Sequence, residues 1–209
     1  MPLESPLPPA PERAANLNQR YKHHGAISVL ERALSDPEVG RIAMVSSFGA
    51  ESVVLLHILA QLDRSTPVLF LDTEMLFPQT LEYQAEVADK LGLTAVQIIK
   101  PDRAQLFEHD NEGLLHLHNP TACCALRKSH PLENALAPFD AWITGRKRYQ
   151  SGQRAQLELF EADAKGRIKV NPLAHWDRAD LAEYMAENRL PRHPLVAKGY
   201  PSIGCAPCT

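Results

Sequence analysis

This sequence of 209 residues has no long hydrophobic run, no excess of basic charge and no recognisable secretory leader. Its longest apolar stretch, Val53–Leu62, is interrupted by His57 and Gln61. A membrane-spanning helix needs about 20 predominantly apolar residues, so this stretch is too short to cross a bilayer. The first residues, Met1–Pro6, have neither the basic start nor the apolar core of a signal peptide. We therefore expect a soluble, cytoplasmic protein without a membrane partner.

The charge balance is slightly acidic, with 22 Lys and Arg against 25 Asp and Glu and a net charge of −3. Nucleic-acid-binding domains are usually basic, so no nucleic-acid partner is expected. Hydrophobic residues make up 44% and charged residues 22% of the chain, which is ordinary globular usage. Five of the first eleven residues are proline. We predict a flexible lead-in over residues 1–16 and a single α/β domain over residues 17–209.

Short apolar segments alternate with segments of helical periodicity along the chain. The predicted strands are 41–45, 68–71, 95–99, 141–144 and 168–173, and the predicted helices are 21–39, 51–62, 79–91, 129–137 and 177–188. Fully apolar strands alternating with helices indicate a mainly parallel, twisted sheet with helices on both faces. Ligands of such sheets bind outside the carboxyl ends of the strands. The loops after Val45, Leu71 and Thr144 should therefore share one edge and form the binding site.

The first of these loops, Ser46–Ser52, is rich in small residues and joins a predicted strand to a predicted helix. Its backbone N–H groups could face a bound anion at the start of the helix, with serine hydroxyls as further donors. The loop matches neither the Walker A motif nor the Rossmann glycine pattern. A tight turn with a serine cap explains the same residues, and the sequence leaves both interpretations open.

At the end of the second predicted strand, Asp72 offers a carboxylate to the same edge. It could accept hydrogen bonds from ribose hydroxyls or an adenine amine, or it could cap the helix that follows.

A basic segment lies between Thr121 and Arg154, with six Lys or Arg residues and only two acidic ones. Three of the cations, Arg146–Arg148, directly follow a predicted strand, which places them at the predicted binding edge. Arginine suits phosphate and sulfate oxygens because it can hold two of them at once. The alternative is a solvated surface patch.

The four cysteines form an adjacent pair, Cys123 and Cys124, and a C-x-x-C pair, Cys205 and Cys208. In a cytoplasmic protein such pairs are more often metal-binding or catalytic than disulfide-bonded. Four thiolates can complete a tetrahedral zinc site or hold an iron–sulfur cluster, and the spacing does not choose between them. Four unrelated thiols, a redox C-x-x-C with two buried cysteines, and a mixed site with His116 and His118 are the alternatives.

Six motifs in order give the sequence a resemblance to a known family over Arg41–Thr209. They are Ser47–Glu51, Leu71–Thr73 with Leu76–Pro78, Cys123–Leu132, Thr144–Ser151, Val170–Leu173 and Gly199–Thr209. In these motifs the chain resembles the assimilatory adenylylsulfate reductases of the phosphoadenylylsulfate reductase superfamily, in the branch that bears an iron–sulfur cluster. The resemblance implies a fold like the adenine nucleotide alpha hydrolases, of the PP-loop type.

The resemblance also implies an activity and a set of site residues. The activity is the thioredoxin-dependent reduction of adenylyl sulfate to sulfite and AMP in sulfate assimilation, with a [4Fe-4S] cluster on Cys123, Cys124, Cys205 and Cys208. The adenosine end of the substrate would be held by Ser47, Phe48, Gly49, Ala50, Glu51, Ser52, Asp72 and Thr73. Lys128 would lie between cluster and substrate, and Lys147 and Arg148 would face the phosphosulfate.

Two departures from the family pattern matter. Tyr149 stands where the family usually has an acidic residue. Family members also carry their nucleophilic cysteine in a tail motif, Glu-Cys-Gly, beyond the C-x-x-C, whereas this sequence ends at Thr209. All four cysteines are assigned to the cluster, so we expect the catalytic cysteine in a tail missing from this sequence.

Three other functions remain as alternatives. They are reduction of the 3′-phosphorylated substrate, a non-catalytic iron–sulfur sensor or nucleotide-binding module, and an adenylyl transferase of the ATP-pyrophosphatase type. The last would carry a Ser-Gly-Gly loop in place of Ser47-Phe48-Gly49. The sequence allows a homo-oligomer but does not fix the oligomeric state.

Overall fold

The computed structural model describes residues 7–150, 152–200 and 202–209, apart from the side chain of Gln153. The chain divides into two compact units. The first unit comprises Met1–Met44 and Phe139–Ala182, and the second comprises Val45–Pro138 and Glu183–Thr209.

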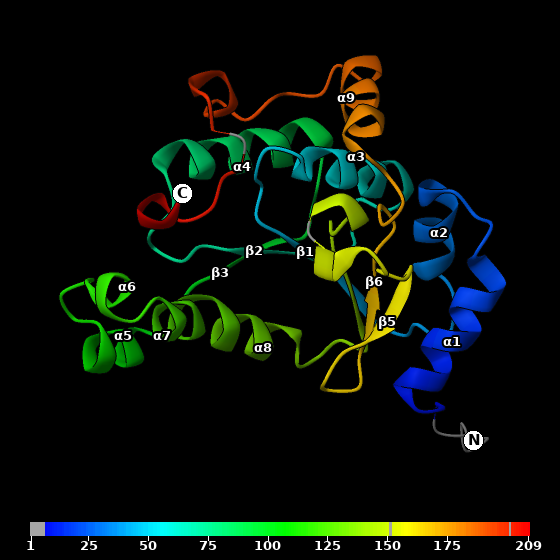
Figure 1. Ribbon diagram of the computed structural model, residues 1–209, viewed down its shortest axis with the longest axis horizontal. Helices are drawn as coiled ribbons and strands as arrows, with labels where there is room; N and C mark the ends of the chain where they lie inside the picture. The colour runs from blue at the N-terminus through cyan, green and yellow to red at the C-terminus, as the bar shows by residue number, and fades with distance from the viewer. Residues whose placement is uncertain (1–6, 151, 201) are drawn as a thin grey trace. The chain divides into compact units, whose positions relative to one another are not determined.

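The strands of Figure 1 are hydrogen-bonded in the order β3-β2-β1-β4-β6-β5. Their bounds are β1 Ile42–Ser46, β2 Val68–Leu71, β3 Val96–Ile99, β4 Ala141–Ile143, β5 Phe160–Ala162 and β6 Ile168–Val170. The pairs β1–β4, β2–β3 and β4–β6 are parallel, whereas β5 runs antiparallel to its neighbour β6. The predicted mainly parallel sheet is therefore confirmed, with β5 as an unpredicted edge strand.

The helices connect these strands (Figure 1). Their bounds are α1 Ala10–Tyr21, α2 Ala26–Ala33, α3 Ser52–Leu62, α4 Pro78–Leu91, α5 Arg103–His109, α6 Leu115–His118, α7 Pro120–Cys124, the π-helical turn η1 Ala125–Ser129, α8 His130–Leu136, α9 Arg178–Glu187, and the 3₁₀ turns η2 Arg148–Gln150, η3 Gly152–Arg154, η4 Val196–Lys198 and η5 Ala206–Cys208. Within the described part of the chain, none of these helices has the length and apolar character needed to cross a bilayer.

Helix α1 corrects the predicted extent of the lead-in, because residues 10–16 are helical rather than flexible. Pro11 lies in the first turn, where its missing N–H leaves no helical hydrogen bond unmade. Ala14 and Leu17 are buried, and the helix packs against β5 within the first unit. Residues 1–6 of the predicted lead-in lie outside the described residues.

The helix predicted over 21–39 is also wrong in its bounds, because α1 ends at Tyr21 and α2 begins at Ala26. Gly25 is the N-cap of α2, with a β-region ψ of 167° that separates the two helices.

In the second unit, α3 is buried almost all round, and this explains its continuous apolar sequence. The ring of Phe48, just before α3, lies edge-on to Phe70 of β2 with the ring centroids 5.2 Å apart. Helix α8 packs against β2 and β3. These contacts fix the carboxyl ends of β1 and β2, from which the predicted site loops emerge.

Candidate cysteine centre and anion-binding loops

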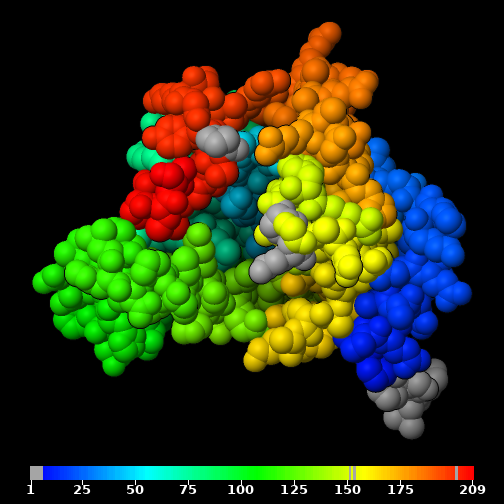
Figure 2. Space-filling view, in the orientation of Figure 1, coloured from blue at the N-terminus to red at the C-terminus, as the bar shows by residue number. Residues whose placement is uncertain are grey.

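All four cysteines lie in the second unit and line one small cavity, together with Met75, His116, Pro120, Arg127 and Lys128. Cys123 and Cys124 end α7, whereas Cys205 precedes the η5 turn and Cys208 is its last residue. Figure 2 shows the C-terminal segment, in red, against the green segment that contains α5 to α7. The structure thus brings together two pairs that are far apart in the sequence.

Local hydrogen bonds explain the position of the first pair. The Asn119 side chain caps α7 by accepting a hydrogen bond from the Ala122 N–H at 3.0 Å, and Pro120 occupies the first turn. The helix then continues as the π-helical turn η1, which places one extra residue in the turn after the cysteines. Such turns occur frequently at functional sites.

The second pair is tied to the loop that follows β2. The Ala206 N–H donates to the Met75 carbonyl at 2.7 Å, and Leu76 and Cys205 form an isolated antiparallel bridge. The Thr209 hydroxyl donates to the Cys205 carbonyl at 2.9 Å and closes the turn. Backbone pairing therefore holds Cys205 beside a loop from the opposite half of the unit's sequence.

A buried ion pair adjoins the cysteine cavity. Arg127 donates to Asp110 Oδ2 from Nε at 3.1 Å and from Nη2 at 2.6 Å, and to the Thr73 carbonyl from Nη1 at 3.0 Å. The Thr73 hydroxyl lies 3.2 Å from the Cys205 sulfur. This arrangement links η1, the loop after β2 and the C-terminal cysteine pair.

The ionisation of these groups follows from burial and from Arg127. Burial alone would raise the pKa of Asp110, but the hydrogen bonds from Arg127 and the Leu115 N–H hold it below its ordinary value. Burial raises the pKa of the Cys123 thiol, and the nearby Arg127 cation opposes that rise. Because a metal binds the thiolate form, metal binding at Cys123 would release the proton of its thiol.

The four cysteines are free thiols, two of them buried (Cys123 and Cys205) and two exposed (Cys124 and Cys208). Within the described residues, no group of three or more His, Cys, Asp or Glu side chains is arranged to hold a single metal ion. His116 lines the cavity and donates its Nδ1 proton to the Gly113 carbonyl at 3.0 Å, because a carbonyl can only accept. The four sulfurs are therefore the main candidate donors at this cavity.

The Ser46–Ser52 loop is more internally bonded than the sequence predicts. The Phe48 N–H donates to the Ser46 hydroxyl at 3.2 Å, and the Gly49 N–H donates to the Ser52 hydroxyl at 3.1 Å. These two N–H groups thus bond within the loop, and the predicted contacts of Phe48 and Gly49 with the substrate stay predictions. Each serine hydroxyl still has a proton to donate, and Ser47 is exposed. Helix α3 itself has no side-chain cap at Glu51.

Backbone geometry explains why this loop is tight. Phe48 has a positive φ of 47° and a fully buried ring, so packing holds a non-glycine residue in the left-handed region. A Cβ on Gly49 would lie 3.3 Å from the Ile203 carbonyl oxygen, which leaves little space for a side chain. Ala50, like Glu51 and Ser52, is partly exposed.

Asp72 and Thr73 have different surroundings. Asp72 Oδ1 accepts the Glu74 N–H at 2.9 Å, and its Oδ2 lies 3.5 Å from the Lys100 ammonium. Asp72 is not the cap of the next helix, because α4 begins at Pro78. The Thr73 hydroxyl lies beside the Cys205 sulfur, and its predicted role at the adenosine end stays a prediction. Lys128 is half-buried and lines the cysteine cavity.

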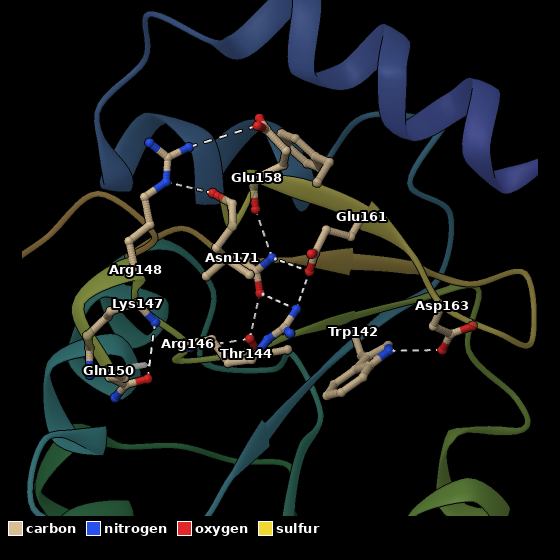
Figure 3. Close-up of polar contacts among 12 residues, drawn as sticks. Trp142, Thr144, Arg146, Lys147, Arg148, Gln150, Glu158, Glu161, Asp163 and Asn171 are labelled. Atoms are coloured by element: carbon tan, nitrogen blue, oxygen red, sulfur yellow. Dashed lines mark hydrogen bonds and ion pairs between the residues drawn. The ribbon is translucent and has the colours of Figure 1, made fainter. Parts of the chain in front are cut away.

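The predicted phosphosulfate residues, Lys147 and Arg148, belong to the first unit and follow β4 (Figure 3). Lys147 is buried, and its N–H donates to Gln150 Oε1 at 3.2 Å. The Arg148 guanidinium donates to the Leu157 carbonyl at 2.8 Å and lies 3.9 Å from the Glu158 carboxylate. These cations are built into the fold, which disagrees with the alternative of a solvated surface patch.

The contacts that join Arg146, Thr144, Glu161 and Asn171 were not predicted from the sequence. Arg146 pairs with Glu161 and Asn171, and Thr144 donates to Asn171 (Figure 3). The motifs that contain Thr144 and Asn171 were the available signal. Tyr149, which replaces the usual acid, lies under the Arg178 guanidinium at 5.6 Å and so interacts with a cation through its ring.

The fold and the loops at the carboxyl ends of the strands define the class of the protein, a nucleotide-binding α/β protein similar to the adenine nucleotide alpha hydrolases. The family model described as phosphoadenosine phosphosulfate reductase domain matches residues 41–209. The chain therefore belongs to the phosphoadenosine phosphosulfate reductase family.

Two similar proteins are named adenosine 5′-phosphosulfate reductase. One, from Mesorhizobium japonicum, is 49% identical over 197 residues, covering 94% of this chain and 77% of that protein. Another, from a Chelativorans species, is 47% identical and covers 94% of this chain and 80% of that protein. Among solved structures, a phosphoadenylyl-sulfate reductase from Candida auris matches with a TM-score of 0.79 and 27% identity, covering 93% of this chain and 95% of that one.

Proposed function

We propose that this protein reduces adenylyl sulfate to sulfite and AMP, with thioredoxin as the electron donor in the cytoplasm. The observation that carries the proposal is the convergence of four free cysteines and Lys128 on one cavity, in a chain of the reductase family. The names of the Mesorhizobium and Chelativorans proteins favour adenylyl sulfate as the substrate.

The cysteine cavity fits a [4Fe-4S] cluster in its donor set, because four thiolates are the complete ligand set of such a cluster. Cys123, Cys124, Cys205 and Cys208 would each bind one iron. When bound, the cluster supplies a redox-capable centre of net negative charge. Arg127 and Lys128 would offset that charge, and Lys128 would face the substrate from the same cavity.

The substrate would be held at both ends by this chain's own groups. Within the second unit, Ser47 and the carboxylate of Asp72 would bind the adenosine end. Lys147 and Arg148 of the first unit are the predicted ligands of the phosphosulfate. Cations beside the anhydride hold the substrate and stabilise the phosphate as it leaves. In this proposal the predicted binding residues act by orientation and charge rather than by covalent chemistry.

The reaction would begin with a cysteine thiolate that is not bound to iron, because a metal-bound thiolate is a poor nucleophile. Since the four cysteines of this sequence would hold the cluster, this thiolate would be the one that the family resemblance assigns to the tail motif Glu-Cys-Gly. The thiolate attacks the sulfate sulfur, the bond from sulfur to the phosphate oxygen breaks, and AMP leaves with the electron pair. A thioredoxin thiolate then attacks the cysteine sulfur of the S-sulfocysteine and releases sulfite. The second thioredoxin thiol closes the thioredoxin disulfide and restores the enzyme thiol.

The test is metal analysis and ligand titration of the anaerobically purified 209-residue chain. We expect four irons and four acid-labile sulfides per chain, visible absorbance, and tighter calorimetric binding of adenylyl sulfate than of its 3′-phosphorylated form. Serine at any one of the four cysteines should abolish cluster retention, whereas Met75→Leu, in the same cavity, should leave it intact. Stoichiometric zinc would overturn the cluster, and preference for the 3′-phosphorylated compound would overturn the substrate.

A further inference from the structure

The carboxyl ends of β4 and β6 are joined by a fully bonded amide, that of Asn171 (Figure 3). Its Oδ1 accepts the Thr144 hydroxyl at 2.7 Å and Arg146 Nη2 at 3.3 Å. Its Nδ2 donates to the Glu158 carbonyl at 2.8 Å and to the Glu161 carboxylate at 2.9 Å. Asn171 is fully buried, and all four hydrogen-bonding positions of its amide are occupied.

The Thr144 hydroxyl extends this network into the turn that follows β4. It donates its one proton to Asn171, so it can only accept from the Arg146 N–H, 3.3 Å away. The direction of every bond is thereby fixed, and so is the backbone of the turn from residue 144 to 148. The Arg148 N–H is held in addition by the Ala174 carbonyl at 3.0 Å.

The network also fixes the Arg146 guanidinium. Nη2 of Arg146 pairs with the Glu161 carboxylate, which is itself oriented by Asn171. Since Glu161 supplies a negative charge, it balances one of the three consecutive cations of the turn. Hydrogen-bonded networks of buried polar groups rigidify the segments that they join, although Nε of Arg146 is buried without a partner. The loss of one partner should therefore loosen the whole turn.

We propose that Asn171, Thr144 and Glu161 are positioning residues that hold the backbone of Arg146, Lys147 and Arg148 in one conformation before an anionic ligand binds. This inference rests on the proposed function for its ligand, adenylyl sulfate. Because the turn is already ordered in the free protein, ligand binding loses less conformational entropy than it would with a flexible turn.

The first test needs no ligand. Thr144→Val removes the hydroxyl with almost no change in shape, and Thr144→Ser keeps it. Amide hydrogen exchange of residues 146–148 should become at least about tenfold faster in Thr144→Val and in Asn171→Ala than in the unaltered chain, as expected when an amide loses its acceptor. Thr144→Ser should restore slow exchange.

Asn18 provides a matched control in the same unit. Its amide also makes two hydrogen bonds to one backbone position, Phe160 of β5, at 2.8 and 3.0 Å, and these bonds lie outside the turn from residue 144 to 148. Asn18→Ala should lower stability while leaving the exchange of residues 146–148 slow. Equal exchange in Asn18→Ala and Asn171→Ala would overturn the positioning role, because the effect would then be general loosening.

The second test uses adenylyl sulfate and calorimetry. Thr144→Val and Asn171→Ala should weaken its binding at least about tenfold, with Thr144→Ser and Asn18→Ala within threefold of the unaltered chain, if preorganisation governs affinity. Unchanged affinity in Thr144→Val, with faster exchange of the turn, would overturn the inference and leave the proposed function standing. If the unaltered chain does not bind adenylyl sulfate, the proposed function is overturned. The exchange data would then still decide whether the network holds the turn.

Discussion

Replacing Arg127 by methionine removes the cation of a buried ion pair while keeping much of the side-chain volume. The variant loses the two hydrogen bonds that Arg127 donates to Asp110 and the one that it donates to the Thr73 carbonyl. Asp110 then stays buried, and its carboxylate keeps the hydrogen bond from the Leu115 N–H. Removing one partner of a buried ion pair typically costs about 3–5 kcal/mol, so we expect a loss of that size in the free energy of unfolding.

Urea unfolding at neutral pH, on preparations matched for metal content, measures this loss. The double variant Arg127→Met with Asp110→Leu should recover part of it, because no buried charge then lacks a counter-ion. Arg41→Met is the control, since Arg41 is 71% exposed in its pair with Asp140. Exposed pairs contribute about 0–1 kcal/mol. A cost for Arg127→Met no larger than that of Arg41→Met would refute the assignment of Arg127 as the neutralising partner of Asp110.

Three further predictions concern other parts of the chain. Gly92→Ala should destabilise the protein by about 1 kcal/mol, because Gly92 ends α4 with a φ of 65°, whereas Gly25→Ala should be close to neutral in the same unfolding assay. Burial lowers the pKa of His193, which accepts the Leu195 N–H, so stability should fall as the pH drops from about 6.5 towards the folded-state pKa. His193→Gln should flatten that pH dependence, and an unchanged profile would contradict it. Arg148→Ala should weaken adenylyl sulfate binding by about 1.5–3 kcal/mol in calorimetry, the range for a hydrogen bond to a charged group, with adenosine binding unchanged. Equal weakening of both ligands would assign Arg148 a structural role.

The parallel strands were predictable because their sequences are mainly apolar, as in Val68–Leu71 of β2. Strand β5 was not, because only Phe160 of its three residues is buried and its polarity resembles that of a loop. The helices α5, α6 and α7 were also missed. They have four to seven residues each, which is too short for a helical period to emerge from the sequence.

For the cysteine site, the sequence pattern predicted which residues would be involved, and the structure brings all four to one cavity. The polar surroundings could not be predicted, because they depend on contacts between distant segments. Arg127 meets Asp110 and Thr73 only after β2, α5 and η1 have packed together. The internal bonds of Phe48 and Gly49 were likewise invisible, since a serine beside a glycine is equally typical of an anion loop and of a self-bonded turn.

The π-helical turn at Ala125–Ser129 affects how the helical segment around it can change. Each residue of an α-helix advances the direction of its side chain by about 100°, so the extra residue shifts the phase between α7 and α8 by that angle. The rotation of Cys123 and Cys124 about the helix axis, relative to α8, therefore differs from the rotation that an uninterrupted α-helix with the same number of residues would give. A deletion of one residue between Ala125 and Ser129 would bring the two segments back into phase. It would rotate Cys123 and Cys124 relative to α8, although no cysteine would be changed.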